Sequence, residues 1–147
     1  ILVVEDIVKP INELSVLLNT MTLEDYKQIG IYFGLMYQII DDVLDYTNEN
    51  RGKQMGDDFR EGKVTFPILL AYQADTDKIF WHQCFDSNRV NNIEFSDVAK
   101  RLHDLGAFEQ SIVAATQYAR KAQESLQLCN SPISDTMHSL VESFLKK

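Results

Sequence analysis

Three aspartates lie close together in one segment, at a spacing that would place them on one side of a helix. The segment reads DDVLD and holds Asp41, Asp42 and Asp45. At about 100° per residue, these carboxylates and the amide of Gln38 fall within an arc of about 100°, and Gly34 points the same way one turn earlier. Like charges three and four residues apart destabilise a helix slightly, so a cation is expected beside them. Carboxylate oxygens suit a hard cation, and Mg²⁺ suits them best where substrate phosphates complete its shell. A solvated acidic face is the alternative interpretation.

The next segment is rich in cations and glycine. It reads RGKQMGDDFREGKVTFP, and its three glycines surround Lys53 and Lys63. Lysine supplies point charge to phosphate oxygens, so the segment suits a diphosphate. Thr65 could add a hydroxyl donor, and Pro67 would fix the start of a following helix. The alternative is a polar surface loop whose lysines are solvated.

Helices must position these residues, because the apolar spacing is helical along nearly the whole chain. The sequence predicts helices over residues 1–19, from the N-cap Thr22 to about Tyr46, around 67–74, over 78–85 and 96–105, through 108–126, and from Ser134 onward, with a loop over 48–62. The long helix has the apolar stripe Tyr26, Ile29, Phe33, Tyr37, Ile40 and Leu44. The later helix has the seam Phe108, Ile112, Ala115, Ala119, Ala122 and Leu126. No alternating stretch of strand length competes with these patterns, so the predicted fold class is all-α.

The composition and net charge of the chain exclude some classes of function. The 147 residues are 45% hydrophobic, which fits one globular domain. A net charge of −8 disfavours nucleic acid and anionic lipid as main partners, and no apolar run is long enough for an integral membrane segment. Two distant cysteines favour a reduced, cytoplasmic protein. The chain opens with ILVVEDIVKP, which we interpret as a fragment, a processed product or the ordered part of a longer chain.

Taken together, GLMYQIIDDVLDYTNENRGKQMGDDFREGKVTFPILLAY resembles the second aspartate-rich region of trans-prenyl diphosphate synthases. That family shows a Phe-Gln pair, DDxxD, a lysine after a glycine, and GKxTxP. Here these are Tyr37-Gln38, DDVLD, Gly52-Lys53 and GKVTFP, with Tyr37 replacing the usual Phe. The GDDFREGKVT wording is similar to bacterial long-chain synthases, of octaprenyl or decaprenyl type, that make quinone side chains.

The resemblance implies a helical bundle of the isoprenoid synthase type, of which residues 1–147 would be a single α-helical domain forming the C-terminal half. It implies Mg²⁺-dependent condensation of an allylic diphosphate with isopentenyl diphosphate by a cytoplasmic homodimer. The implied metal ligands are Asp41, Asp42 and Asp45. The implied substrate-binding residues are Gln38, Lys53, Lys63 and Thr65. Asp41, Asp42 and Lys63 would carry catalysis.

The family's first aspartate-rich motif and its Lys-Thr pair are absent from these residues, so the chain alone is expected to be incomplete. Two alternatives stay open: a non-catalytic interaction subunit, which the intact DDVLD disfavours, and a terpene cyclase-like diphosphate-binding domain, which GKVTFP disfavours. His82 and Cys84 are too few for a zinc site, and Phe80 and Trp81 are interpreted as core aromatics. Phe33, Tyr37 and the 108–126 seam are too much apolar surface for so short a chain to bury, so association is expected.

Overall fold

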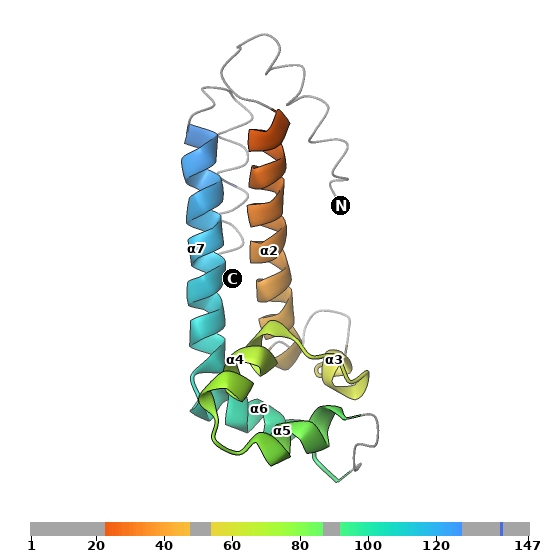
Figure 1. Ribbon diagram of the computed structural model, residues 1–147. Helices are drawn as coiled ribbons and strands as arrows, with labels where there is room; N and C mark the ends of the chain where they lie inside the picture. Colours follow the sequence, from red (N-terminus) through yellow and green to blue (C-terminus); the bar gives the residue numbers. More distant parts are fainter. Residues whose placement is uncertain (1–22, 48–53, 87–91, 128–138, 140–147) are drawn as a thin grey trace. The chain divides into compact units, whose positions relative to one another are not determined.

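The structure is a computed structural model that describes residues 23–47, 54–86, 92–127 and Ser139 (Figure 1). Every element within these ranges is helical: α2 (Leu23–Thr47), α3 (Asp57–Arg60), α4 (Phe66–Ala74), α5 (Lys78–Phe85), α6 (Phe95–Asp104) and α7 (Ala107–Gln127). The all-α prediction is confirmed. The helices predicted over 1–19 and from Ser134 fall outside the described residues, Ser139 excepted. None of the described helices has the length and apolar character needed to cross a membrane.

The predicted boundaries of the helices hold to within about two residues, but the predicted loop over 48–62 is wrong at α3. Gly56 precedes this helix with a left-handed φ of 85°, a conformation that glycine adopts without strain. The N–H of Gly56 donates to the carbonyl of Asp45 at 2.8 Å, which returns the chain to the end of α2. A four-residue helix that depends on such contacts leaves no periodic signal in the sequence.

The chain divides into two compact units. In the first, the described helical segments are 23–37 of α2 and 116–127 of α7, together with Ser139; the two segments lie side by side and run in opposite directions (Figure 1). Ala119 and Ala122 are fully buried, and small side chains let helices approach closely. The rings of Tyr32 and Tyr118 lie 6.2 Å apart, and Lys121 Nζ lies 5.6 Å from the Tyr32 ring centroid.

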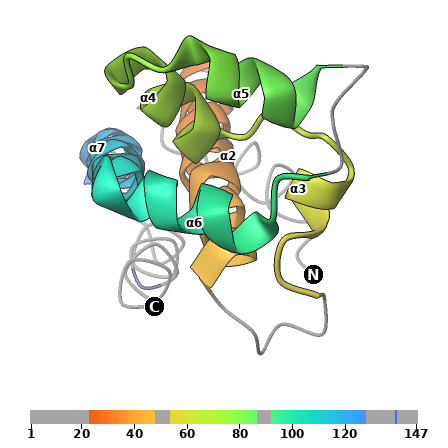
Figure 2. The same ribbon diagram turned by 90° about the horizontal axis from the view of Figure 1, so that it is seen from below.

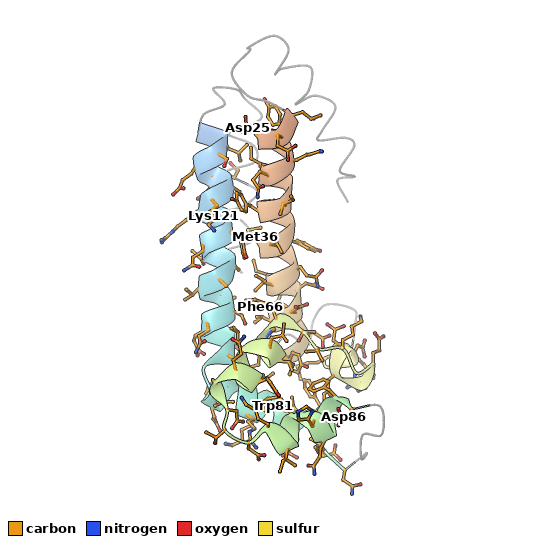
Figure 3. The ribbon with its side chains drawn as sticks, in the orientation of Figure 1. Asp25, Met36, Phe66, Trp81, Asp86 and Lys121 are labelled. Carbon is orange, nitrogen blue, oxygen red and sulfur yellow. The ribbon has the colours of Figure 1, made fainter. Side chains whose placement is uncertain are left out.

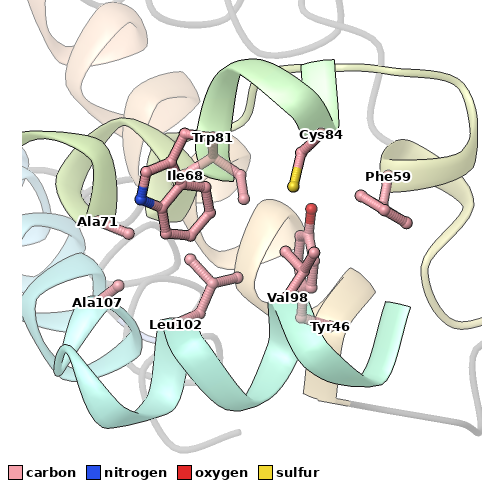
Figure 4. Packing of buried hydrophobic residues seen from close by; sticks show 9 residues of the cluster. All are labelled: Tyr46, Phe59, Ile68, Ala71, Trp81, Cys84, Val98, Leu102 and Ala107. Atoms are coloured by element: carbon pink, nitrogen blue, oxygen red, sulfur yellow. The ribbon is translucent and has the colours of Figure 1, made fainter. Parts of the chain in front are cut away.

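The second unit, Gln38–Ala115, contains the main apolar core. Its buried side chains are Tyr46, Phe59, Ile68, Ala71, Trp81, Cys84, Val98, Leu102 and Ala107 (Figure 4). Helices α4 and α5 lie on one side of this cluster and α6 on the other (Figures 2 and 4). Trp81 is buried and Phe80 packs against the cluster, which confirms both as core aromatics.

A buried carboxylate joins three helices of this unit. Asp75, which follows α4, accepts hydrogen bonds from Trp81 Nε1 on α5 at 3.0 Å and from Arg101 Nε on α6 at 2.6 Å. The backbone N–H of Asp77 donates to its other oxygen at 3.0 Å. The Arg101 guanidinium, with the Asp77 amide and the Trp81 indole, holds the pKa of Asp75 well below its usual range.

The buried faces of the two long helices differ in part from the predicted ones. On α2, Tyr37 is 44% exposed while Met36 is fully buried, so that part of the stripe prediction is wrong. On α7, Ile112 is 42% exposed, and the neighbouring Ser111 is buried instead. Ser111 avoids an unsatisfied hydroxyl by donating to the carbonyl of Ala107 at 2.7 Å. Contacts with neighbouring elements, and not the apolar pattern alone, therefore select the face that each helix buries.

Candidate metal and diphosphate site

The C-terminal part of α2 holds the predicted acids at different depths. Asp41 and Asp45 are half-buried, whereas Asp42 is only 7% exposed. Helix geometry explains the difference, because Asp42 lies about 40° around the helix from the buried Tyr46, while Asp45 lies about 100° from it. Gln38, one turn before Asp42, is exposed. The predicted polar arc therefore runs from the surface to the edge of the core.

Both carboxylate oxygens of Asp42 accept hydrogen bonds. Gln38 Nε2 donates to Oδ1 at 2.9 Å. The backbone N–H of Phe66, the first residue of α4, donates to Oδ2 at 3.0 Å. Phe66 lies beside the C-terminal part of α2 (Figure 3). An orphan N–H at a helix N-terminus is a favourable partner for an anion, so Asp42 fastens α4 to α2.

Asp45 makes a second connection between α2 and the segment that follows it. Its Oδ2 accepts a hydrogen bond from the backbone N–H of Asp58, in α3, at 3.2 Å. Its carbonyl accepts from Gly56, as described above. The two ends of the segment that carries Lys63 are thus bonded to the DDVLD residues, α3 through Asp45 and α4 through Asp42.

Lys63 lies between these two attachments. Its Nζ is 3.0 Å from Asp58 Oδ1 and 3.1 Å from Glu61 Oε2, and its backbone N–H donates to the carbonyl of Asp58 at 2.9 Å. The hydrogen bonds to Asp58 and Glu61 hold the pKa of Lys63 above its usual range. Its side chain is 59% exposed, so a charged ammonium is presented to solvent.

Thr65 lies deeper than its predicted role suggests. It is 6% exposed, and no described residue makes a hydrogen bond of ordinary geometry with its hydroxyl or with that of the buried Tyr46. Burial raises the pKa of Tyr46 well above its usual range, and the nearby Thr65 hydroxyl acts in the opposite direction. The Thr65 hydroxyl is therefore buried near that of Tyr46, and substrate contact by Thr65 stays a prediction.

The structure brings most of the predicted site residues together. Gln38 donates to Asp42, and Asp45 is connected to Lys63 through Asp58, whose N–H donates to Asp45 and whose carboxylate accepts from the Lys63 ammonium. Asp41 belongs to the same arc of α2, and Lys53 lies outside the described residues. Sequence analysis missed Asp58, although an acid five residues before Lys63 in a glycine-flanked segment was a signal for a local ion pair.

The donor set fits a magnesium ion that shares its shell with a phosphate. Within the described ranges, no three Asp, Glu, His or Cys side chains form a ready metal cluster. Mg²⁺ is commonly held by one or two carboxylates plus substrate phosphates and water, and not by an all-protein cage. Asp41 and Asp45 provide carboxylates of that kind at the surface end of the arc.

The fold places the chain among the all-helical isoprenoid synthases. It is similar to a crystal structure of polyprenyl synthase from Caulobacter crescentus CB15, complexed with calcium and isoprenyl diphosphate, with a TM-score of 0.74 and 29% identity. That match covers 85% of this chain and 40% of the other. The family model described as polyprenyl synthetase matches residues 9–102, more than half of the chain. The chain belongs to this family.

Two curated relatives show the same likeness. One is a geranylgeranyl pyrophosphate synthase of Geoglobus acetivorans, 28% identical over 120 residues, which are 80% of this chain and 36% of the relative. The other is the octaprenyl diphosphate synthase of Escherichia coli, 48% identical over 56 residues, which are 37% of this chain and 16% of the relative. In each match the chain spans well under two thirds of the relative's length.

Proposed function

We propose that this chain forms the metal- and diphosphate-binding part of a trans-prenyl diphosphate synthase. The reaction joins an allylic diphosphate to isopentenyl diphosphate, releases diphosphate and gives a polyprenyl diphosphate of the length used for quinone side chains. The family membership, the octaprenyl synthase relative and the similarity to a protein complexed with calcium and isoprenyl diphosphate support the proposal. We also propose that the complete protein is a cytoplasmic homodimer.

One observation carries it: the acidic face of α2 and the Lys63 segment are bonded to each other within one compact unit. The N–H groups of Asp58 and Phe66 donate to Asp45 and Asp42, so the backbone of the segment that carries Lys63 is held beside the carboxylates. A diphosphate needs both kinds of group, since lysine contacts its oxygens directly and carboxylates reach them through a metal ion. A solvated acidic face would not need this connection.

The chemistry follows from where charge develops. Breaking the allylic carbon–oxygen bond leaves extra negative charge on the departing diphosphate, and fixed positive groups stabilise that transition state. Bound Mg²⁺ would supply Lewis-acid stabilisation of the departing diphosphate. Asp41 and Asp45 would hold the ion, with Gln38 beside them, and Lys63 would contact the diphosphate directly. Lys53 and Thr65 are proposed contacts of the same substrate, and Asp42 is a third proposed ligand of the ion.

Calorimetric titration with inorganic pyrophosphate tests the binding part of the proposal. We expect binding that requires Mg²⁺ and weakens at least about tenfold in Lys63→Ala, because a diphosphate loses a charge-assisted contact. Lys27→Ala is the matched control, since Lys27 is an exposed lysine near the N-terminus of α2, 3.8 Å from Glu24. Equal binding with and without Mg²⁺, or equal loss in both variants, would contradict the proposal.

Product analysis separates the remaining classes of function. A complete protein that carries this sequence, given an allylic diphosphate and labelled isopentenyl diphosphate, should incorporate label into a longer diphosphate. A cyclised hydrocarbon without incorporation would indicate a terpene cyclase. A complete protein that assembles with its partner chain but does not bind pyrophosphate would indicate a non-catalytic interaction subunit.

A further inference from the structure

A single aromatic ring from α6 contacts the neighbours of both residues that form the hydrogen bond between Asp58 and Asp45. Phe95, the first residue of α6, stacks on Tyr46 of α2, with ring centroids 5.4 Å apart and an angle of 20° between the rings. Tyr46 directly follows Asp45. The Phe95 ring also lies 6.2 Å from that of Phe59, which directly follows Asp58 in α3. Both partners of this bond therefore have a neighbour that packs against the same ring.

The same ring covers the turn that begins α3, which lies beside the N-terminal end of α6 (Figure 2). A Cβ at Gly56 would lie 2.6 Å from the Phe95 ring, so the ring is packed directly against the backbone of this glycine. The N–H of Gly56 donates to the carbonyl of Asp45 at 2.8 Å, and the N–H of Asp58 donates to the Asp45 carboxylate at 3.2 Å. The Phe95 side chain is therefore packed beside the bonds that attach α3 to α2.

We propose that Phe95 is a positioning residue of the diphosphate site. Its ring holds α3 against the end of α2, and α3 in turn holds the Lys63 segment, because the N–H of Lys63 donates to the carbonyl of Asp58 at 2.9 Å. This inference rests on the proposed function for the meaning of the site, but the contacts that carry it are features of the fold. All of these residues belong to the second compact unit.

The physical argument is that α3 is too short to be stable without tertiary contacts. It has four residues, its N-cap Gly56 has no side chain that could cap it, and Phe59 is its buried residue. The Phe95 ring gives apolar contact to both the turn and Phe59, and aromatic pairs stabilise a fold beyond the area that they bury. Without this ring, we expect α3 to separate from α2 more often and to carry Lys63 away from the carboxylates.

Three variants separate positioning from general core packing. Phe95→Met removes the ring with little loss of volume, because methionine fills a core site without a flat face that could stack on Tyr46. Phe95→Tyr keeps the ring. Phe80→Met is the matched control, since Phe80 is also half-buried at the edge of the same cluster but packs on Trp81, at 5.1 Å between ring centroids, and on Arg101. A role confined to core packing predicts similar effects of the two methionine variants.

The first measurement is amide hydrogen exchange at Gly56 and Asp58, which needs neither metal nor diphosphate. We expect exchange to be faster by at least about tenfold in Phe95→Met and to stay within about threefold of the unmodified chain in Phe95→Tyr and Phe80→Met. The amide of the buried Leu102, in α6, reports general loss of stability and should not share the increase. Unchanged exchange in Phe95→Met, or an equal increase at Leu102 or in Phe80→Met, would overturn the inference.

The second measurement is calorimetric titration with pyrophosphate at saturating Mg²⁺. Phe95→Met should weaken binding at least about fivefold, because a loosely held lysine must be ordered when the anion binds, whereas Phe95→Tyr and Phe80→Met should stay within about twofold. Equal losses in the two methionine variants would overturn the inference. If pyrophosphate fails to bind the unmodified chain, the proposed function fails, while the exchange rates still decide whether Phe95 holds α3 against α2.

Discussion

Asp41 and Asp57 are both aspartates near the same glycine-rich segment, and the structure gives them different tasks. Asp57 forms a surface pair with Arg60 at 2.8 Å, and both side chains are well exposed. Such pairs contribute about 0–1 kcal/mol to stability. Asp41 belongs to the arc of α2 that also carries Asp45. The consequences of removing the two carboxylates should therefore differ.

We predict that Asp41→Ala weakens Mg²⁺-dependent pyrophosphate binding at least about tenfold, which is about 1.4 kcal/mol, whereas Asp57→Ala changes it less than about twofold. The reason is that only the first substitution removes a proposed ligand of the ion that contacts the diphosphate. Calorimetry of both variants at saturating Mg²⁺ provides the comparison. Equal losses would show that the helical-face argument is wrong.

At this scale the sequence predicted the residue types of the site but not their separate roles. Helical spacing was enough to put Gln38 and the three acids on one arc. It could not show that Asp42 accepts the N–H of Phe66, because that bond joins residues 24 positions apart. The bond from the backbone N–H of Asp58 to Asp45 was hidden in the same way, since it spans 13 positions.

Replacing glycine by alanine should have opposite effects on stability at two positions of this chain. A Cβ at Gly56 would lie 2.6 Å from the ring of Phe95 and would require a left-handed backbone, whereas a Cβ at Gly34, within α2, meets nothing within 4 Å. We predict that Gly56→Ala lowers the free energy of unfolding by about 2–4 kcal/mol through strain and overpacking. Gly34→Ala should raise it by about 0.5–1 kcal/mol because alanine favours the helix. Urea unfolding of both variants measures this, and a stable Gly56→Ala chain would contradict the predicted packing of Phe95.

The junction of α4, α5 and α6 should respond to pH through Asp75. Its folded pKa lies well below the usual range, chiefly because Arg101 donates to it. A depressed carboxyl pKa stabilises the fold above the unfolded pKa, about 3.9, and that stabilisation is lost as pH falls through the folded pKa. We predict that Asp75→Asn costs roughly 2–3 kcal/mol at neutral pH.

The loss caused by Asp75→Asn should shrink progressively below about pH 4, where the unmodified chain loses the same contribution. Thermal unfolding between pH 7 and pH 2 follows it. Asp97→Asn is the control, because Asp97 is an exposed acid on α6 and should change stability by less than about 0.5 kcal/mol. A difference between Asp75→Asn and the unmodified chain that stays constant down to pH 2 would rule out the proposed linkage.

Periodicity predicted the long elements well, and α5 residue for residue. Periodicity failed to predict those features that depend on contacts between residues far apart in the sequence. The short helix α3 follows from the turn at Gly56, and the choice of Met36 over Tyr37 as a buried residue of α2 follows from which neighbours cover that helix. A helix with apolar residues on two adjacent stripes does not define its own buried face.

For the whole molecule, we expect the proposed reaction to need more residues than this chain contains. The chain carries one aspartate-rich motif, whereas the resemblance described above implies two in a complete protein, and its match covers 40% of the length of the Caulobacter polyprenyl synthase. We predict that the 147 residues bind Mg²⁺-pyrophosphate but do not lengthen an allylic diphosphate. A condensation assay with labelled isopentenyl diphosphate tests this, with a complete family member as positive control. Turnover close to that of the control would show that one motif suffices.

Apolar side chains on the described surface also bear on how the molecule behaves in solution. The chain itself buries part of the apolar surface that the sequence predicted to be in excess, because Ala115, Ala119, Ala122 and Leu126 of the predicted seam are buried. On α2, however, Ile31 is 53% exposed and Leu35 is 40% exposed. Residues four apart on a helix are neighbours, so these two side chains form one apolar strip.

We therefore predict that the chain self-associates at micromolar concentration, with α2 contributing to the contact. Sedimentation should give a mass above the 16.9 kDa of one chain. Replacing Ile31 and Leu35 together by lysine should shift the distribution to monomer, because burying two ammonium groups without partners opposes association. Val64→Lys is the matched control, since Val64 is 52% exposed but lies outside any helix, and it should leave the mass unchanged. A sharp monomer that unfolds cooperatively would mean that the chain covers its own apolar surface and that the association argument fails.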